Sequence, residues 1–207
     1  SNGGGRPDLD NDSRRVHSFP TIGAHPRATT WRQLMSHDID FAALTLRDTL
    51  DLAIAIEEEA KERYDEFAEQ LEAHRTPEVA KFFRFMSDNE VKHAEVLAAQ
   101  RADLFGNEPS TADASMLVEI EAPEYDGARA FMSIEDALDV AHAAEVKAYD
   151  FYNQALPSVE DDAIKELFTR LRDEEVRHQE MIKEIKAKVP EGGGFDPNDF
   201  VDEATGQ

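Results

Sequence analysis

Apolar residues recur at alternating spacings of four and three residues in four long segments of the chain. This spacing places the apolar residues on one face of an α-helix and is typical of helices in a bundle. It predicts helices over about residues 45–72, 77–104, 134–155 and 158–188. The buried face of each predicted helix is called its seam below.

Local sequence signals support these helix boundaries. The spacing of a capping box is found in Thr45 with Asp48 and in Ser133 with Asp136. Thr76 is a favourable N-cap residue, and Pro77 suits the first position of a helix. Gly106 suits the end of the second helix, because glycine readily adopts the left-handed conformation found there.

The second half of the chain repeats the first half. An offset of 88 residues relates the first predicted helix to the third, and an offset of 85 relates the second to the fourth. Matched pairs include Leu50 and Leu138, Glu57 and Glu145, Tyr64 and Tyr152, Phe83 and Phe168, Glu90 and Glu175, and His93 and His178. The chain therefore uses one αα-hairpin twice.

Loop lengths predict how the two hairpins connect. Only a few residues join the first helix to the second and the third to the fourth, so the helices of each pair are antiparallel neighbours. The connector over about residues 107–132 can span about 85 Å when extended, whereas each helix is about 40 Å long. We therefore expect an all-α, ferritin-like four-helix bundle of two αα-hairpins joined by one long crossover.

Composition divides the chain into three parts. Residues 1–40 are rich in Gly, Pro, Arg, Asp and Ser, and we expect them to be mostly disordered with a short helical turn around Trp31–Met35. Residues 41–189 form the expected ferritin-like four-helix domain. Residues 190–207 are rich in helix breakers and acidic side chains, and we expect a flexible tail.

Charge and composition narrow the possible partners. The net charge of −23 argues against nucleic acid and anionic lipid as partners. It would attract divalent cations, although the simpler interpretation is a solvated acidic surface. The chain has no Cys, which excludes disulfides and Cys-ligated metals. No apolar run is long enough to span a membrane and no secretion signal is visible, so we expect no membrane partner and a cytoplasmic location.

Six seam positions carry polar residues where apolar ones are expected. They are Glu57, Glu90, His93, Glu145, Glu175 and His178. Burying unpaired carboxylates is very costly, no Lys or Arg occupies a seam, and two His supply at most two positive charges. Bound metal cations would neutralise the carboxylates, and the alternative is a satisfied polar network without metal.

The arrangement of these residues indicates the kind of metal site. A Glu-x-x-His pair places a carboxylate and an imidazole one turn apart on the same helix face, so both can reach one ion. One such motif is no better than chance, but here two occur in register, with a Glu on each of the other two helices. This is the ligand pattern of di-iron and di-manganese carboxylate sites, whose oxygen and imidazole donors suit Fe(II) or Mn(II).

Four segments carry a resemblance to the ferritin-like superfamily and, within it, to rubrerythrin-like domains. They are AIEEEAKERYDEFA, NEVKHAEV, HAAEVKAYDFYNQA and EEVRHQEM, and the resemblance covers about residues 45–188. It implies an antiparallel bundle with a non-haem di-iron site that reacts with O2 or peroxide, with the same six residues as ligands. It also implies a homo-oligomer, a dimer or larger, because ferritin-like hairpins often pair.

The chain departs from the rubrerythrin pattern in two respects. Rubrerythrins usually carry a further carboxylate one turn along the third helix, where this chain has Ala148. The six-residue set is in this respect closer to ferritins and bacterioferritins. Full-length rubrerythrins also carry a rubredoxin-type iron site held by four cysteines, which this chain lacks. Peroxidase activity would therefore need an external electron donor.

Side chains beside the predicted ligands have two interpretations each. Tyr64 and Tyr152 lie two turns beyond the seam Glu of their helices, where they would either hydrogen-bond a ligand and line the O2 pocket or be core aromatics. His142 is either an extra ligand or proton relay, or a partly exposed side chain. We expect Glu58 and Glu59 to point off the seam into solvent.

These features favour an oxidoreductase with two Fe ions that oxidises Fe(II) or removes peroxide, in iron homeostasis or oxidative stress. The substrates would be O2 or peroxide. One alternative is a di-manganese catalase or a di-iron oxygenase, although no sequence feature indicates the elongated pocket that an oxygenase needs. The other alternative is a metal-binding helical interaction module without turnover.

Overall fold

The computed structural model of the chain describes residues 39–110, 120–189 and 196. The helical turn predicted around Trp31–Met35, and the predictions for nearly all of the N-terminal segment and the C-terminal tail, lie outside the described residues. The described residues hold the whole of the predicted four-helix region apart from part of its crossover.

Four long helices make up the described part of the chain, which has no strand. They are α2 (Leu46–Ala73), α3 (Pro77–Phe105), α4 (Ile134–Ala155) and α5 (Asp162–Lys188). The first three match their predicted ranges closely. The fourth begins at Asp162 rather than near residue 158, because Leu156–Ser158 form a 3-10 turn and the Asp161 carboxylate caps α5.

Capping boxes lie at the N-termini of α2 and α4, as predicted. Both capping boxes form: the backbone amide of Asp48 donates to Thr45 Oγ1 at 3.2 Å, and the amide of Asp136 donates to Ser133 Oγ at 3.0 Å. Thr76 is the N-cap residue of α3, as predicted, and Pro77 takes the first helical position, but the Thr76 side chain does not cap the helix. Its hydroxyl donates to the Leu71 carbonyl at 3.0 Å and makes no cap hydrogen bond, so it fastens the preceding turn instead.

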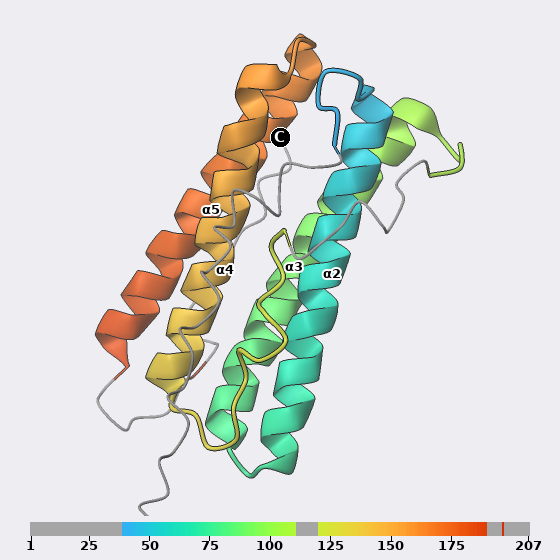
Figure 1. Cartoon of the computed structure of the whole chain (residues 1–207). Coiled ribbons are helices and arrows are strands. Elements are labelled where there is room, and N and C mark those ends of the chain that lie inside the picture. Colours follow the sequence, from blue (N-terminus) through green and yellow to red (C-terminus); the bar gives the residue numbers. More distant parts are fainter. Residues whose placement is uncertain (1–38, 111–119, 190–195, 197–207) are drawn as a thin grey trace, which may run out of the picture.

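The topology is that of two antiparallel hairpins (Figure 1). α2 packs mainly on α3, and α4 packs mainly on α5. α3 and α4 run parallel, and residues 120–132 of the crossover run along the bundle to the start of α4 (Figure 1). This confirms the predicted all-α bundle of two αα-hairpins with one long crossover.

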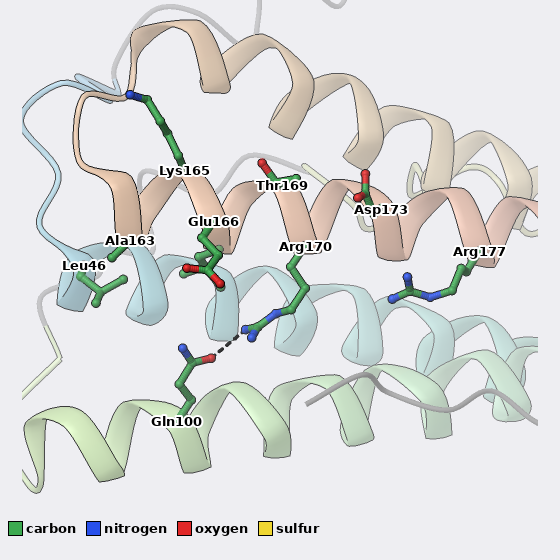
Figure 2. Close-up of a pocket in the computed structure, with 10 residues that line it drawn as sticks. Leu46, Gln100, Ala163, Lys165, Glu166, Thr169, Arg170, Asp173 and Arg177 are labelled. Atoms are coloured by element: carbon green, nitrogen blue, oxygen red, sulfur yellow. Dashed lines mark hydrogen bonds between the residues drawn. The ribbon is translucent and has the colours of Figure 1, made fainter. Parts of the chain in front are cut away.

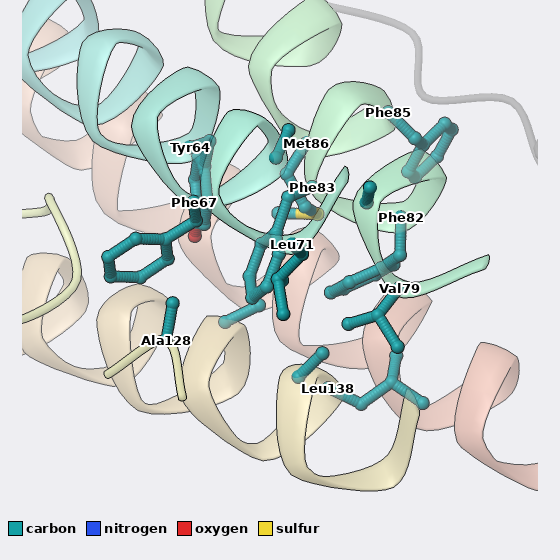
Figure 3. Packing of buried hydrophobic residues seen from close by; sticks show 14 of the residues in the cluster. Tyr64, Phe67, Leu71, Val79, Phe82, Phe83, Phe85, Met86, Ala128 and Leu138 are labelled. Carbon is teal, nitrogen blue, oxygen red and sulfur yellow. The ribbon is translucent and has the colours of Figure 1, made fainter. Parts of the chain in front are cut away.

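Two apolar clusters fill the bundle, one toward each end. The first holds the side chains between residues 60 and 86 of the first hairpin together with the start of α4 and the end of α5. In Figure 3 the rings of Tyr64, Phe67 and Phe83 meet at centroid distances of 5.3 to 5.9 Å, with Leu138 of α4 beside them. The second cluster holds the start of α2, the end of α4 and the start of α5.

The six polar seam residues lie between the two apolar clusters. Along α2, Glu57 separates Ile56 of one cluster from Ala60 of the other. Along α4, Glu145 lies between Ala141 and Ala148 in the same way. The fold therefore places one polar layer across the middle of an otherwise apolar bundle.

The two capping boxes give a direct test of the helix boundaries. Thr45→Ala and Ser133→Ala should each lower the free energy of unfolding by about 1 kcal/mol, because each leaves helix N-terminal amides without an acceptor. Thr76→Ala should lower it less, since the Thr76 hydroxyl caps no helix. Urea denaturation measures the three values, and equal losses for all three variants would contradict the assignment.

Candidate metal centre

All six polar seam residues are buried in the structure. None exposes more than 4% of its surface. They lie in two groups of three. In each group, one carboxylate oxygen or imidazole nitrogen of every side chain lies within 4.8 Å of the corresponding atoms of the other two. The first triplet is Glu57, Glu90 and His93, and the second triplet is Glu145, Glu175 and His178.

The first triplet comes entirely from the hairpin of α2 and α3. His93 Nδ1 lies 3.4 Å from Glu90 Oε2, one turn earlier on α3. It lies 3.7 Å from Glu57 Oε2 on α2. The three side chains therefore converge on a volume that a single cation can fill.

The second triplet repeats this arrangement in the hairpin of α4 and α5. His178 Nδ1 lies 3.1 Å from Glu145 Oε2 and 3.7 Å from Glu175 Oε2. The rings of His93 and His178 stack in parallel, with centroids 4.7 Å apart and planes 7° apart. Because the two rings touch, the two triplets are neighbours in one layer.

Glu121 is a further member that the sequence analysis missed. It lies on the crossover, is 1% exposed, and forms a third group with Glu90 and Glu145, again with atoms within 4.8 Å of one another. Glu121 therefore lies among the six predicted residues, although helical periodicity did not single it out. Together with the two triplets, Glu121 makes the polar layer, which holds five carboxylates and two imidazoles.

A weak signal for Glu121 is present in the sequence. Helical periodicity identified the other members, but Glu121 lies in an irregular segment where no period applies. Its neighbours Ile120 and Ala122 are apolar, and both are buried. An acidic residue between two apolar residues was the available indication, and Glu119 in the same stretch shows the same pattern.

Burial and neighbouring charges shift the pKa values of most carboxyl groups in the polar layer. Burial raises the pKa of Glu90 to about 7, with further increases from the charges of Glu145 and Glu57, while His93 opposes the rise. Burial also raises the pKa of Glu175 and of Glu121 well above the usual range of a carboxyl group. Burial acts in the same direction on Glu145, but the hydrogen bond and charge of His178 outweigh it and lower its pKa.

Several carboxylate oxygens in the layer are buried without a hydrogen-bond partner. They are Oε2 of Glu57, both oxygens of Glu90, both oxygens of Glu121 and Oε2 of Glu175. Buried polar atoms in folded proteins are nearly always paired, and leaving a buried charge unpaired is costly. Oxygen atoms that converge, together with two imidazoles, are suitable donors for a pair of divalent cations such as Fe(II) or Mn(II).

The two tyrosines beside the layer differ in their contacts. Both are completely buried. The Tyr64 hydroxyl donates to Glu145 Oε1 at 3.3 Å, so it joins the first hairpin to a member of the second triplet. The Tyr152 hydroxyl is buried without a hydrogen-bond partner, and after burial the charges of Glu57 and Glu121 contribute most to raising its pKa.

The remaining candidates lie outside the layer. His142 is half-buried, and it belongs to none of the three groups that gather metal-binding atoms. Glu58 is exposed, as predicted, whereas Glu59 is half-buried. The prediction of a fully solvated side chain at Glu59 was therefore wrong, because its position on α2 turns it partly toward neighbouring helices.

Two surface grooves flank the bundle. One, of about 660 Å³, runs along α5 beside α3, where Arg170 donates to Gln100 at 2.7 Å (Figure 2). The other, of about 1110 Å³, follows α4 and the crossover and is lined in part by His142. No member of the polar layer lines either groove. Within the described residues, no helix combines the length and apolar character needed to cross a membrane.

The fold and the polar layer define a ferritin-like four-helix protein with a buried cluster of carboxylates and histidines. A family model for rubrerythrin matches residues 48–186, more than half of the chain, so the protein belongs to the rubrerythrin family. No curated protein matches the chain.

A solved structure supports the fold assignment. The chain is similar to an uncharacterised conserved protein from Magnetospirillum magnetotacticum, known from a crystal structure, with a TM-score of 0.55 and 28% sequence identity. The match covers 72% of this chain and 97% of that chain.

The raised pKa of Glu90 predicts how the metal-free protein responds to pH. The carboxyl group binds its proton more tightly in the folded chain (pKa about 7) than in the unfolded chain (4.5), so stability is lost as pH rises from 4.5 through about 7. The melting temperature of the metal-free protein should therefore fall between about pH 5 and about pH 8. Scanning calorimetry after chelation measures this.

Two variants isolate the contribution of Glu90. Glu90→Gln removes the titrating group, so the melting temperature should fall less steeply with pH than in the wild-type protein. Glu58→Gln removes an exposed carboxyl group of α2 and should keep the wild-type slope. If Glu90→Gln and the wild-type protein have the same slope, the assignment of this pH dependence to Glu90 is wrong.

Proposed function

We propose that the polar layer binds two iron ions, one at each triplet, and that the protein is an oxidoreductase acting with O2 or peroxide. The observation that supports this most directly is the set of buried carboxylate oxygens that converge without hydrogen-bond partners. Membership of the rubrerythrin family supports it as well. The biological outcome would be oxidation of Fe(II) or removal of peroxide.

In this proposal the metal ligands are the two triplets defined above. Each hairpin supplies two carboxylates and one imidazole to one position. Glu90 also lies in the group that includes Glu145 of the other hairpin, so it suits a carboxylate that bridges both positions. The arrangement keeps the two positions adjacent, which a reaction that takes one electron from each of two ions requires.

The chain's own groups would control charge, protons and water around the site. The acidic members with raised pKa release their protons when a cation arrives, so metal binding and deprotonation are linked. Tyr64 is a positioning residue, since its hydroxyl donates to Glu145 and fixes that carboxylate. The apolar clusters on both sides of the layer exclude bulk water.

When bound, two ferrous ions supply two electrons, one each, to O2 or peroxide. Peroxide reduced to water takes up two electrons and two protons, so repeated turnover needs a donor that returns the electrons. These 207 residues contain no Cys to hold a rubredoxin-type iron site, and we propose an external electron donor. We also propose assembly into a homo-oligomer, a dimer or larger, which analytical ultracentrifugation would test.

The same measurements separate the alternatives. Purified protein should contain about two Fe per chain by elemental analysis. Two Mn per chain would favour a di-manganese catalase instead. Bound metal without O2 or peroxide consumption would favour a metal-binding module without turnover. The two grooves described above avoid the polar layer, which gives an oxygenase reaction on an organic substrate no structural support.

Single substitutions test which residues hold the metals. Glu175→Ala should lose the metal of the second triplet, because Glu175 belongs to that group alone. Glu90→Ala should weaken binding at both positions, because Glu90 belongs to two groups. Metal stoichiometry after loading with Fe(II) under anaerobic conditions measures both effects.

Glu58→Ala is the matched control, since Glu58 neighbours Glu57 on α2 but is exposed. It should bind metal like the wild-type protein. Equal stoichiometry in all three variants would contradict the ligand assignment. If the wild-type protein binds no metal and its melting temperature does not change with Fe(II), the proposed function itself is wrong.

A further inference from the structure

Glu121 differs from the other carboxylates of the polar layer because it does not lie on a helix. It lies at the beginning of the described part of the crossover, residues 120–132, which runs lengthwise between the two hairpins (Figure 1). Its side chain is 1% exposed, and neither carboxylate oxygen has a hydrogen-bond partner. A buried carboxyl group in this condition either keeps its proton or requires an opposing positive charge.

Two basic side chains hold the backbone next to Glu121. Lys147 of α4 donates to the carbonyl of Ala122 at 2.6 Å, and Arg63 of α2 donates to the carbonyl of Pro123 at 2.5 Å. The Arg63 guanidinium also lies 3.2 Å from the centre of the Tyr125 ring. The crossover is therefore fastened to the first helix of each hairpin immediately after Glu121.

Anchored in this way, the Glu121 side chain reaches into the polar layer. One of its carboxylate oxygens lies within 4.8 Å of possible metal-binding atoms of Glu90 and Glu145, which come from different hairpins. The charges that act on it are those of Glu57, Glu175, Glu90 and Glu145. Glu121 thus lies close to one carboxylate of each triplet, Glu90 and Glu145.

We propose that Glu121 is a seventh metal ligand, delivered by the crossover, and that metal binding and docking of the crossover on the bundle are coupled. The inference rests on the proposed two-metal site. With metal bound, Glu121 gains the positive charge that it otherwise lacks, which draws residues 120–123 onto the bundle. Coupling of this kind is reciprocal, so a docked crossover also raises the affinity for metal.

A helical ligand and a crossover ligand respond differently to metal. The backbone around Glu90 and Glu145 is fixed by helix hydrogen bonds whether or not metal is present. Hydrogen bonds from the long side chains of Lys147 and Arg63 hold the backbone at residues 122 and 123, and we expect this backbone to open more easily than helical backbone. Backbone amides near Glu121 should therefore report metal binding more strongly than amides elsewhere in the bundle.

Hydrogen exchange of the full chain, with and without Fe(II) under anaerobic conditions, tests the coupling. In the wild-type protein, Fe(II) should slow exchange across residues 120–129. In Glu121→Gln, Fe(II) should leave this segment unprotected while still slowing exchange in α3 and α5, and its affinity should fall about tenfold or more. Glu124→Gln is the matched control, because Glu124 is an exposed carboxylate of the same segment and should behave like wild type.

Stability without metal separates a ligand from a merely structural residue. Glu121→Gln removes a buried group that lacks a partner, so the metal-free variant should melt at or above the wild-type temperature. A lower melting temperature, with unchanged Fe(II) affinity, would assign Glu121 a structural role and overturn the inference. Equal Fe(II) affinity and equal crossover protection in Glu121→Gln and Glu124→Gln would overturn it as well.

The outcomes also distinguish this inference from the proposed function. A wild-type protein that binds no Fe(II) contradicts both. Two bound Fe(II) in the wild-type protein, with no effect of Glu121→Gln on affinity or exchange, contradicts only the role of Glu121 and leaves the two triplets as the metal site.

Discussion

The fold is organised around the mutual repulsion of five carboxylates in the middle of a helical bundle. Carboxylates this close cannot all be ionised unless positive charge joins them, and the two imidazoles can supply only part of it. The two apolar clusters of the bundle are arranged around this layer. The apolar clusters lie on both sides of it, so the packing that holds the helices together does not depend on the layer itself.

The repeated hairpin produces two similar triplets, but their surroundings differ. Glu145 accepts a hydrogen bond from Tyr64 and lies 3.1 Å from His178, and its pKa is lowered. The pKa of Glu90, which contacts His93 less closely, is raised. Because the pKa of Glu175 is raised as well, a cation meets less competition from protons at Glu145 than at either Glu90 or Glu175.

The sequence predicted most of this arrangement because the helices obey a strict period. Any residue on a seam is buried, so the polar seam residues, such as Glu57 and His178, could be placed in one layer from their numbers alone. The period also located three helix starts, two of them marked by capping boxes. The start of α5 was misplaced because Pro157 and Asp161 create a turn whose details depend on local hydrogen bonds rather than on the apolar pattern.

Helical periodicity could not predict which side chains on irregular segments are buried. The burial of Glu121 depends on the path of the crossover, which tertiary contacts to Arg63 and Lys147 determine. The sequence analysis treated the seams as the complete source of buried charge and therefore missed buried Arg63 as well, since it lies off the seam of α2. Periodicity reveals which residues a helix buries, but only the packed structure reveals which loops are buried against it.

A ligand on the crossover has a physical advantage over one more carboxylate on α4. Positions on a helix are fixed relative to one another, so a further helical Glu at position 148 would approach the layer at a set height above Glu145. The crossover can adjust its backbone, and its carbonyl groups at residues 122 and 123 accept hydrogen bonds from two cationic side chains. Lys147 and Arg63 thereby hold the acidic segment against an already acidic layer through its backbone, which leaves the volume between the carboxylates to the proposed metal ions.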